Sequence, residues 1–389
     1  MGELQEHLNV GLAFALSKRW DEAAREFEAA AAAGPSDPEA FFQLGKAYQA
    51  IGQSAKAEAA LRRCCELDAS RIEARARLGQ VLGALGRRDE AEASLREALA
   101  KDSGSVLALN SLGDVLMAKG QLEPAAAAWE RTLAAQPDQP EAQYKLGFAY
   151  ESLGRFDQAS ARYQAACQLQ PKRLPLRLAL AGLYEKMGKL PEMAAAWGEV
   201  VALRPQDSAM LLSWAGALEK AGDPAGAAAA YEQVVQLDAS NAEAARRLGW
   251  SKLASGDSQA AEKWLRVAAQ GLPSGVEKDL AAAWLDQMAG RLDEAARGYR
   301  SVAAVQPERV EAWELLANLL YRRSDFAGAE EAFGKLVELK PGHAEAWTRM
   351  GSLSLKLGRR EAALKAWEEA LRLDPSNAIV RKNLAVLKG

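Results

Sequence analysis

Residues 141–171 read EAQYKLGFAYESLGRFDQASARYQAACQLQP, and the spacing of small and large residues in this stretch recurs along the whole chain. Steps of 34 residues in either direction from Gly147 always land on glycine or alanine. The resulting eleven positions are Gly11, Gly45, Gly79, Gly113, Gly147, Ala181, Ala215, Gly249, Ala283, Ala317 and Gly351. A fixed period of this size predicts an array of helical repeats, in which each copy packs mainly against its neighbours.

Each copy carries a second small residue twelve positions after the first, which is alanine in every copy except the one with Met193. A large apolar residue follows one helical turn later, on the same face of the helix. Small residues allow two helices to approach closely, so the pattern predicts a helix pair with the large side chain filling the remaining space. These large residues are Phe27, Leu61, Leu95, Trp129, Tyr163, Trp197, Tyr231, Leu265, Tyr299, Phe333 and Trp367.

Glycine and proline mark the turns of the repeat. The position seven residues after the first small residue suits a helix C-terminal glycine with positive φ. Nine copies have glycine there: Gly52, Gly86, Gly120, Gly154, Gly188, Gly222, Gly256, Gly290 and Gly358. Eight copies have proline in the turn to the next copy: Pro35, Pro137, Pro171, Pro205, Pro273, Pro307, Pro341 and Pro375. Each copy is therefore predicted to be a helix, a glycine turn, a second helix and a proline turn.

This pattern resembles the tetratricopeptide repeat family, most fully in the last two copies, where Trp313 and Trp347 stand at the aromatic start of the first helix. The resemblance implies an all-α, right-handed superhelical solenoid. The first helix of each repeat would line a concave groove, and the second would form the convex back. The eleven repeats would span 4–37, 38–71, 72–105, 106–139, 140–173, 174–207, 208–241, 242–275, 276–309, 310–343 and 344–377, and a C-terminal solvating helix would follow at 378–389.

Composition argues against several other classes of function. A net charge of −3 and a pI near 5.8 do not favour nucleic-acid binding. The three cysteines do not suggest a disulfide framework or a metal site, and they favour a reducing compartment. His7 and His343 are the only histidines and lie far apart in sequence, and no phosphate-binding loop follows a predicted strand. We therefore expect a non-enzymatic protein with no metal and no cofactor.

The first twenty residues do not resemble a signal peptide, because Glu3 and Glu6 stand where basic residues are needed. They fit the first repeat instead. No transmembrane segment is expected, so we predict a protein that does not insert into membranes. The expected location is the cytoplasm, or the periplasm if the chain is an excised part of a longer protein.

In the resembled family, ligands contact the first helix three residues before the first small residue, one after it, and four or five after it. The corresponding and adjacent groove candidates here are Asn110, Asp114, Met117, Tyr144, Phe148, Trp250, Leu253, Trp284, Met288, Asn318 and Tyr321. Phe42 and Leu280 occupy such positions too, but packing is favoured for both. Trp250 and Trp284 leave two alternatives open. Either they bind a ligand, or their helices are rotated and the tryptophans supply the core packing that Lys252 and Asp286 do not provide.

Two binding signatures of the family are absent. The clamp for acidic C-terminal tails needs a lysine and an asparagine on one first helix; Asn318 fits, but Glu314 stands in the lysine position. The asparagine ladder of the glycosyl-transferring relatives is also missing. A protein or peptide partner is expected, without its identity.

The preferred function is a protein–protein interaction scaffold or adaptor that binds a peptide or partner helix in the groove. One alternative is a self-assembling module, a homo-oligomer joined through repeat one, whose first helix carries Leu8, Leu12 and Leu16. Leu8 and Leu12 could equally pack under repeat two. Another alternative is the repeat region of a larger envelope-export or glycosyltransferase-associated protein. RNA binding is a weaker option, because the groove has few basic residues.

Overall fold

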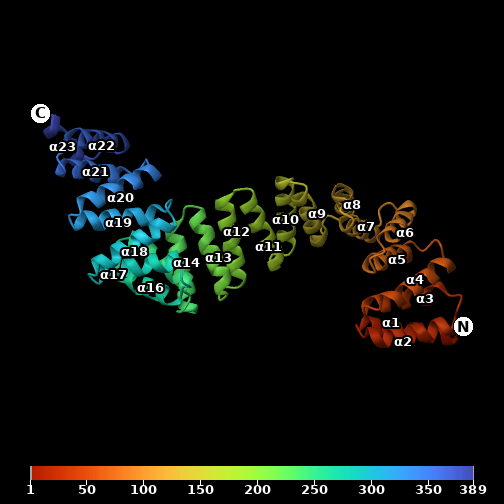
Figure 1. Ribbon diagram of the computed structural model, residues 1–389. Helices are drawn as coiled ribbons and strands as arrows, with labels where there is room; N and C mark the ends of the chain where they lie inside the picture. The colour runs from red at the N-terminus through yellow and green to blue at the C-terminus, as the bar shows by residue number, and fades with distance from the viewer. Residues whose placement is uncertain (1, 389) are drawn as a thin grey trace. The chain divides into compact units, whose positions relative to one another are not determined.

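The computed structural model describes residues 2–388, and its chain divides into two compact units (Figure 1). The first unit, Met1–Leu203, is a stack of helix pairs in which each helix packs mainly on its neighbours in sequence. Its helices are α1 (Gly2–Leu16), α2 (Trp20–Ala33), α3 (Pro38–Ala50), α4 (Ser54–Leu67), α5 (Ile72–Ala84), α6 (Arg88–Lys101), α7 (Val106–Ala118), α8 (Leu122–Ala135), α9 (Pro140–Ser152), α10 (Phe156–Leu169), α11 (Leu174–Lys186) and α12 (Leu190–Leu203).

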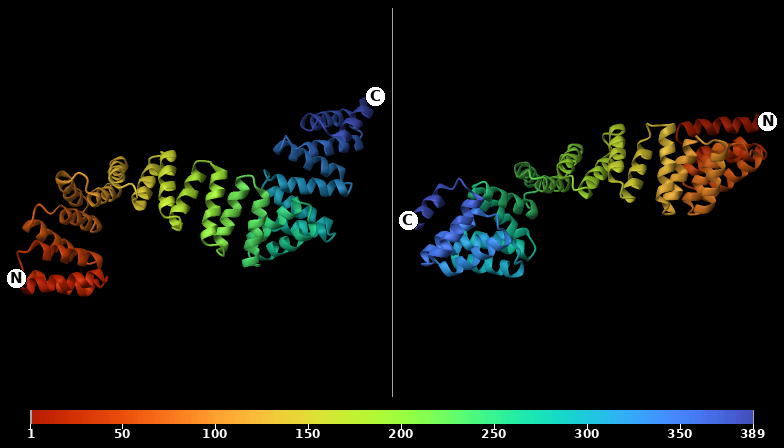
Figure 2. Two further views of the ribbon diagram at one scale, coloured as in Figure 1. Left: turned by 180° about the vertical axis from the view of Figure 1, so that it is seen from behind. Right: turned by 90° about the horizontal axis from the view of Figure 1, so that it is seen from above.

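The second unit, Arg204–Gly389, is built in the same way, and the views in Figure 2 show its helices following one another in pairs. Its helices are α13 (Ser208–Lys220), α14 (Pro224–Leu237), α15 (Ala242–Ala254), α16 (Ser258–Gly271), α17 (Val276–Met288), α18 (Leu292–Val305), α19 (Val310–Arg322), α20 (Phe326–Leu339), α21 (Ala344–Lys356), α22 (Arg360–Leu373) and α23 (Ala378–Lys388). Residues 2–388 contain no strand. The predicted all-α solenoid fold is confirmed in both units.

The core of each helix pair is the contact between the small residue of one helix and the large residue of the next. A Cβ atom placed on Gly147 would lie 2.7 Å from ring carbons of Tyr163, so nothing larger than glycine fits there without movement. Ten of the eleven predicted large residues are buried, and only Trp197 is partly exposed. Burying side chains of this size stabilises the fold by about 1.5–3 kcal/mol each.

The turn within each pair requires a left-handed backbone. All nine predicted glycines have φ between 68° (Gly188) and 85° (Gly256). The two pairs that lack this glycine adopt the same conformation with Lys18 at φ 56° and Ser324 at φ 63°. The turn geometry is therefore set by the packing of the helices, and those two turns hold it with residues that disfavour it.

Two kinds of contact recur between neighbouring pairs and hold the start of several first helices in place. The carbonyl of the turn proline accepts a hydrogen bond from the fourth residue of the following helix; the Trp313 indole donates to Pro307 at 2.8 Å, and the Trp347 indole donates to Pro341 at 2.9 Å. In three places an arginine before the helix pairs with a glutamate at the start of the preceding first helix. The three pairs are Arg71–Glu39, Arg173–Glu141 and Arg309–Glu277.

The two ends of the chain differ in how they cover apolar surface. On α1, Leu8 is buried, Leu12 is 38 % exposed and Leu16 is 87 % exposed. On α23, Val380 and Leu384 are buried against Trp367. Gly389, the last residue of the predicted C-terminal helix, lies outside the described residues.

Candidate functional site

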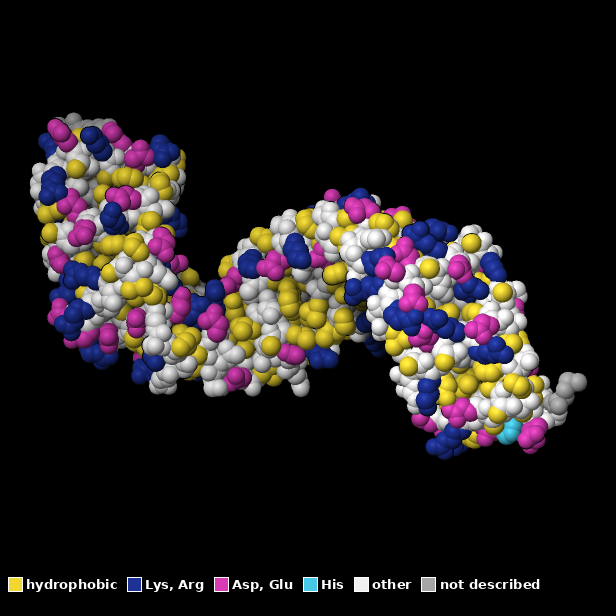
Figure 3. Space-filling model, turned by 45° about the vertical axis from the view of Figure 1, so that its right-hand side comes forward, with side chains coloured by type: hydrophobic (Ala, Val, Ile, Leu, Met, Phe, Trp, Pro, Cys, Tyr) yellow, Lys and Arg dark blue, Asp and Glu magenta, His cyan; other side chains and the backbone are white. Residues whose placement is uncertain are grey.

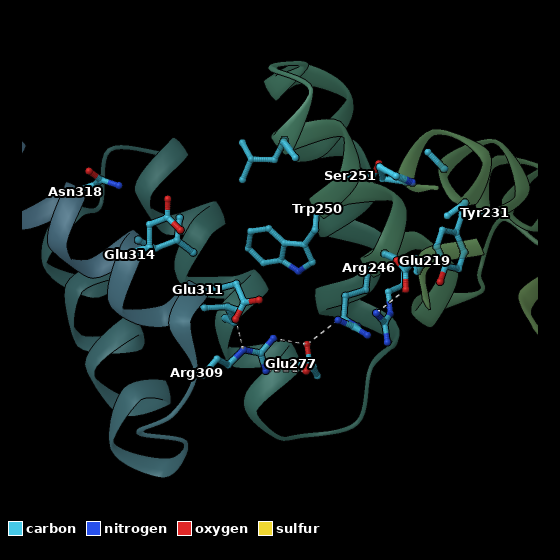
Figure 4. Close-up of a pocket in the computed structure, with 18 residues that line it drawn as sticks. Glu219, Tyr231, Arg246, Trp250, Ser251, Glu277, Arg309, Glu311, Glu314 and Asn318 are labelled. Atoms are coloured by element: carbon cyan, nitrogen blue, oxygen red, sulfur yellow. Dashed lines mark hydrogen bonds and ion pairs between the residues drawn. The ribbon is translucent and has the colours of Figure 1, made fainter. Parts of the chain in front are cut away.

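A hollow with a volume of about 610 Å³ lies on the second unit. Its lining comes from α15, α17 and α19, together with the end of α13 and the start of α14 (Figure 4). Four of these five helices, α13, α15, α17 and α19, are the first helices of consecutive pairs. The hollow therefore spans several repeats of the unit.

The floor of the hollow is apolar and centred on Trp250. The indole projects from α15 into the space that faces α19, and Leu253, Leu280 and Leu315 lie around it. Trp250 is partly buried, and its Nε1 has no hydrogen-bond partner in the described structure. The indole therefore offers its ring surface to the hollow, whereas its N–H is enclosed by the protein.

Trp284 lies beneath this floor. It is 2 % exposed, and its ring meets the ring of Trp250 edge-on with the centroids 6.4 Å apart. It belongs to the hydrophobic core of the second unit. Trp250 and Trp284 therefore divide the two alternatives left open by the sequence: the first lines the hollow, and the second fills the core.

A rotation of α17 explains the burial of Trp284. In the pairs whose first small residue is glycine, a Cβ added to that glycine would meet the large residue of the second helix. In the pair of α17 and α18, a Cβ added to Gly298 of α18 would lie 2.7 Å from the Cβ of Ala283. Ala282, which stands where α9 buries Leu146, is exposed. Asp286 is turned toward Arg291 and accepts hydrogen bonds of 2.6 and 2.8 Å from it. With Ala282 exposed and Trp284 buried, α17 turns a different face to its neighbours than α9 does.

Repeat eight keeps the usual orientation at its own irregular position. Lys252 pairs with Glu232 of the preceding helix at 2.5 Å. Tyrosine hydroxyls make the corresponding contact elsewhere, from Tyr48 to Glu28 and from Tyr150 to Glu130. The lysine therefore replaces a hydrogen bond with an ion pair, and α15 has no reason to rotate.

A network of ion pairs forms one side of the hollow. The nearly buried guanidinium of Arg246 donates to Glu243 at 2.6 and 3.0 Å and to Glu277 at 2.8 Å. Arg309 donates to both carboxylate oxygens of Glu277 at 2.7 and 3.1 Å. Burial alone would raise the pKa of Glu277, but the hydrogen bonds from Arg309 and the charges of both arginines lower it overall. Glu277 thus stays ionised between two cations.

The neighbouring side chains of α13 and α14 extend this network. Arg247 donates to Glu219 at 2.9 Å and to Glu243 at 3.0 Å. Tyr231 is buried beside them, and burial together with the charge of Glu219 raises the pKa of its hydroxyl. These groups are held in place by one another, so the rim is preorganised.

The opposite wall is formed by α19, where Glu311, Glu314 and Asn318 face the hollow (Figure 4). The Glu311 carboxylate lies 3.7 Å from Arg309 Nε, and its side chain is 68 % exposed. The Glu314 carboxylate lies 3.5 Å from His343 Nε2, and its side chain is 41 % exposed. Both distances exceed those of a direct charged hydrogen bond, which are about 2.7–2.9 Å.

The candidates in the first unit form a separate group. Phe148 is 48 % exposed on α9, while Tyr144 is partly buried with its ring centroid 5.5 Å from that of Tyr163. Asp114 is engaged by Lys145 at 2.6 Å. Asn110 and Met117 are partly buried on α7. Asp114 lines a smaller hollow of about 260 Å³ together with residues of α5 and α7.

Two further candidates lie outside the hollow in the second unit. Met288 is 45 % exposed at the end of α17. Tyr321 packs edge-on against Phe326 and Phe333, and the Lys356 ammonium lies 4.8 Å from its ring centroid. Of the predicted groove residues, the hollow brings together Trp250, Leu253 and Asn318. Phe42 and Leu280 are buried, as the preference for packing anticipated.

The residues that the sequence did not single out are the arginines of the hollow. Arg246 stands three residues before Gly249, at a groove position, so a search of those positions for charge could have found it. Arg247 and Arg309 lie outside the expected contact positions. The glutamates at the helix starts were expected only to complement helix dipoles, but Glu277 also connects Arg246 to Arg309.

Charged side chains of both signs alternate over the visible face of each unit (Figure 3). Among the described residues, no group of histidine, cysteine, aspartate and glutamate has the arrangement of a metal site. No helix within 2–388 is both long enough and apolar enough to cross a bilayer.

Comparison with known families covers most of the chain. Models described as tetratricopeptide repeat, or TPR repeat, match residues 38–71, 72–100, 113–154, 140–173, 178–241, 218–274, 280–344 and 344–377. The chain belongs to the tetratricopeptide repeat family. Several of the matches begin at the first residues of helices, at Pro38, Pro140 and Ala344. Tetratricopeptide repeat proteins act mainly as protein-interaction scaffolds and are typically non-enzymatic.

Solved structures of tetratricopeptide repeat proteins resemble the chain in fold. Cut9–Hcn1, an APC/C hetero-tetramer, matches 97 % of this chain and 95 % of its own at a TM-score of 0.51 and 13 % identity. MamA matches 42 % of this chain and 95 % of its own at a TM-score of 0.39 and 28 % identity. Pseudomonas aeruginosa pilF matches 52 % of this chain and 91 % of its own at a TM-score of 0.42 and 23 % identity. Among curated proteins, no relative matches the chain.

Proposed function

We propose that this tetratricopeptide repeat protein is an interaction scaffold that binds a peptide segment of a partner protein in the hollow on its second unit. The observation that carries the proposal is the position of Trp250. Its indole lies at the centre of the hollow with Nε1 unpaired, among apolar side chains and beside fixed charges. Tryptophan in such surroundings is a frequent centre of binding energy at protein interfaces.

The size and chemistry of the hollow support a peptide as the occupant. Its volume of about 610 Å³ is shared among several helices, so an elongated segment can contact more than one repeat. The ring of Trp250 and the leucines that line the hollow suit an apolar side chain. The ion-paired rim needs no rearrangement before binding, which lowers the entropic cost of association.

Selection from random peptides displayed on phage, with the full chain as bait, tests the proposal. Selected peptides would be synthesised and their affinities measured for the wild type, Trp250→Ala and Trp250→Phe. We expect Trp250→Ala to weaken binding by about tenfold or more. Trp250→Phe keeps an aromatic ring but presents a smaller apolar surface, so its effect should be smaller and still measurable.

Trp264→Ala is the matched control, because Trp264 lies on α16 of the same helix pair and does not line the hollow. Its affinity should stay within about twofold of the wild type, as expected of a site away from the contact. Circular dichroism would establish that each variant is folded. If every selected peptide binds Trp250→Ala and Trp250→Phe as tightly as the wild type, the proposed site is wrong.

Self-association through α1 is a second candidate, favoured by the exposure of Leu12 and Leu16 at the end of the first unit. Sedimentation velocity of the wild type and Leu16→Glu would test it. Val305→Glu is the control, because Val305 is 67 % exposed on another helix. A wild type that sediments as a monomer at the highest concentration, or an oligomer unaffected by Leu16→Glu, would rule out this route.

A further inference from the structure

The charges around the hollow are unequally satisfied. Four glutamates and three arginines line it. The donors of Arg246, Arg247 and Arg309 are directed at carboxylates of the same rim, at distances of 2.6–3.1 Å. The cations are therefore already occupied, whereas part of the negative charge is not.

The unsatisfied charge is concentrated on the α19 wall. Glu311 and Glu314 are three residues apart on this helix, so they lie on one side of it. The basic side chains near them are Arg309, whose Nε lies 3.7 Å from Glu311, and His343, whose Nε2 lies 3.5 Å from Glu314. Asn318 follows one turn after Glu314 and adds an amide at the same wall. This surface can accept hydrogen bonds from a cation that a ligand brings.

The floor beside this wall suits the remainder of a long basic side chain. The aliphatic part of an arginine or lysine packs well on apolar surface while its charged end stays at a polar rim. Trp250 on α15 and the two glutamates on α19 face each other across the hollow, as Figure 4 shows.

An acidic anchor is disfavoured by the same geometry. The three arginines of the rim are neutralised by Glu219, Glu243 and Glu277, so an acidic side chain would find no free cation there. It would instead lie beside the carboxylates of Glu311 and Glu314, and the like charges would repel one another.

We propose that the partner segment anchors in the hollow through an arginine or lysine, with its aliphatic stem on Trp250 and its cation at Glu311 and Glu314. This inference rests on the proposed function, because it specifies the occupant of the same hollow.

The experiment uses the phage-selected peptides as probes and the full chain as receptor. Each peptide would be synthesised with every arginine replaced in turn by citrulline, which keeps the shape and removes the charge, and with every lysine replaced by norleucine. We expect one basic residue whose replacement weakens binding to the wild type by about tenfold, as for a charged hydrogen bond across an interface.

A second receptor identifies where that charge acts. In Glu311→Gln plus Glu314→Gln, the same replacement should weaken binding by less than about threefold, because the coupling between the two charges is gone. The control is Glu262→Gln plus Glu294→Gln, which also removes two carboxylates from exposed helix surface of the second unit. With that receptor, the full tenfold loss should remain.

The outcomes separate this inference from the proposed function. Peptides that depend on Trp250 but lose nothing when their basic residues are neutralised would overturn the basic anchor and leave the peptide-binding function standing. The same conclusion follows if the loss is equally large in Glu311→Gln plus Glu314→Gln. If no selected peptide depends on Trp250, both proposals fail together.

Discussion

Helices α9 and α17 carry the same pattern position in two different environments. Phe148 on α9 and Trp284 on α17 both follow the first small residue of their repeat. Phe148 is 48 % exposed, whereas Trp284 is 2 % exposed. In α9 the small residue is opposite the large side chain of the next helix, and in α17 it is opposite Gly298. The comparison shows that the repeat fixes a residue's position along the helix, whereas its orientation depends on how the helix is rotated.

Truncation of the two aromatic residues should give the largest difference between these helices. Trp284→Ala leaves a cavity in the core of the second unit and should cost about 3–5 kcal/mol of unfolding free energy. Phe148→Ala should cost much less, about 0.5–1 kcal/mol, because nearly half of the side chain is already exposed. Urea unfolding followed by circular dichroism measures both. Equal losses would contradict the orientation of α17 described above.

Substitution of a glycine on α18 tests more directly how α17 is rotated against it. Gly298→Leu places a side chain where a Cβ would already lie 2.7 Å from Ala283, so we expect a loss of roughly 1–3 kcal/mol. Gly334→Leu is the control, because nothing lies within 4 Å of a Cβ at that position of α20. It should be neutral or stabilising by up to about 1 kcal/mol, since glycine is a poor helix former. If both variants were equally stable, α17 and α18 would not be in close contact at Gly298.

Turn residues allow a smaller comparison, between adjacent pairs of the second unit. Gly290 and Ser324 occupy equivalent turns with φ of 77° and 63°. Ser324→Gly should stabilise the unit by about 0.5–1 kcal/mol, because glycine adopts this conformation without strain. Gly290→Ser should destabilise it by a similar amount. Thermal unfolding of the two single variants and of the exchanged double variant would measure both effects; a change of the same sign in both single variants would argue against a conformational origin.

The smallest expected effect concerns pH and the first unit alone. His7 on α1 lies 2.7 Å from Glu26 on α2, and this hydrogen bond, with the negative charge of Glu26, raises the pKa of His7 above its usual 6.5. The pair therefore stabilises the contact between α1 and α2 at pH values below the pKa of the histidine in the unfolded chain. The stabilisation is lost as the pH rises through the higher pKa of the folded state.

Nuclear magnetic resonance of the histidine side chains measures this titration. Glu26→Gln should bring the His7 titration back toward the usual value, because the charge that holds the proton is removed. A His7 that titrates identically in the wild type and in Glu26→Gln would show that the pair does not form in solution. His343 serves as an internal reference, since it lies in the second unit.

Most of the fold was predictable because its determinants are local and repeated. The small and large residues of each helix pair, and the glycine of each turn, occupy fixed positions, and the structure confirms the packing and the left-handed turns. Even Lys18 and Ser324 follow the pattern, since the helix packing imposes the turn where glycine is missing. Periodicity of this kind is a strong signal because every copy provides independent evidence for the same unit.

The site was predictable only in part, because it depends on helix rotation and on side chains from several repeats. Trp250 was found from its position, but the sequence could not decide between it and Trp284. The irregular residues Lys252 and Asp286 signalled a change, yet only α17 rotates, since Lys252 finds Glu232 as a partner. The pairing of Arg246 and Arg309 with one glutamate depends on distances between neighbouring helices, which no single repeat encodes.

Glu277 joins side chains from three consecutive first-helix segments through one carboxylate. Arg246 approaches it from α15, and Arg309 approaches it from the turn before α19. Because the pKa of Glu277 is lowered in the folded state, its ion pairs add to the free energy of unfolding at neutral pH. This stabilisation is lost as the pH falls through the pKa of the folded state. Acid would then release two neighbours in a single protonation. Within the second unit, the contacts that join α15, α17 and the turn before α19 would therefore loosen before those of the outer helices.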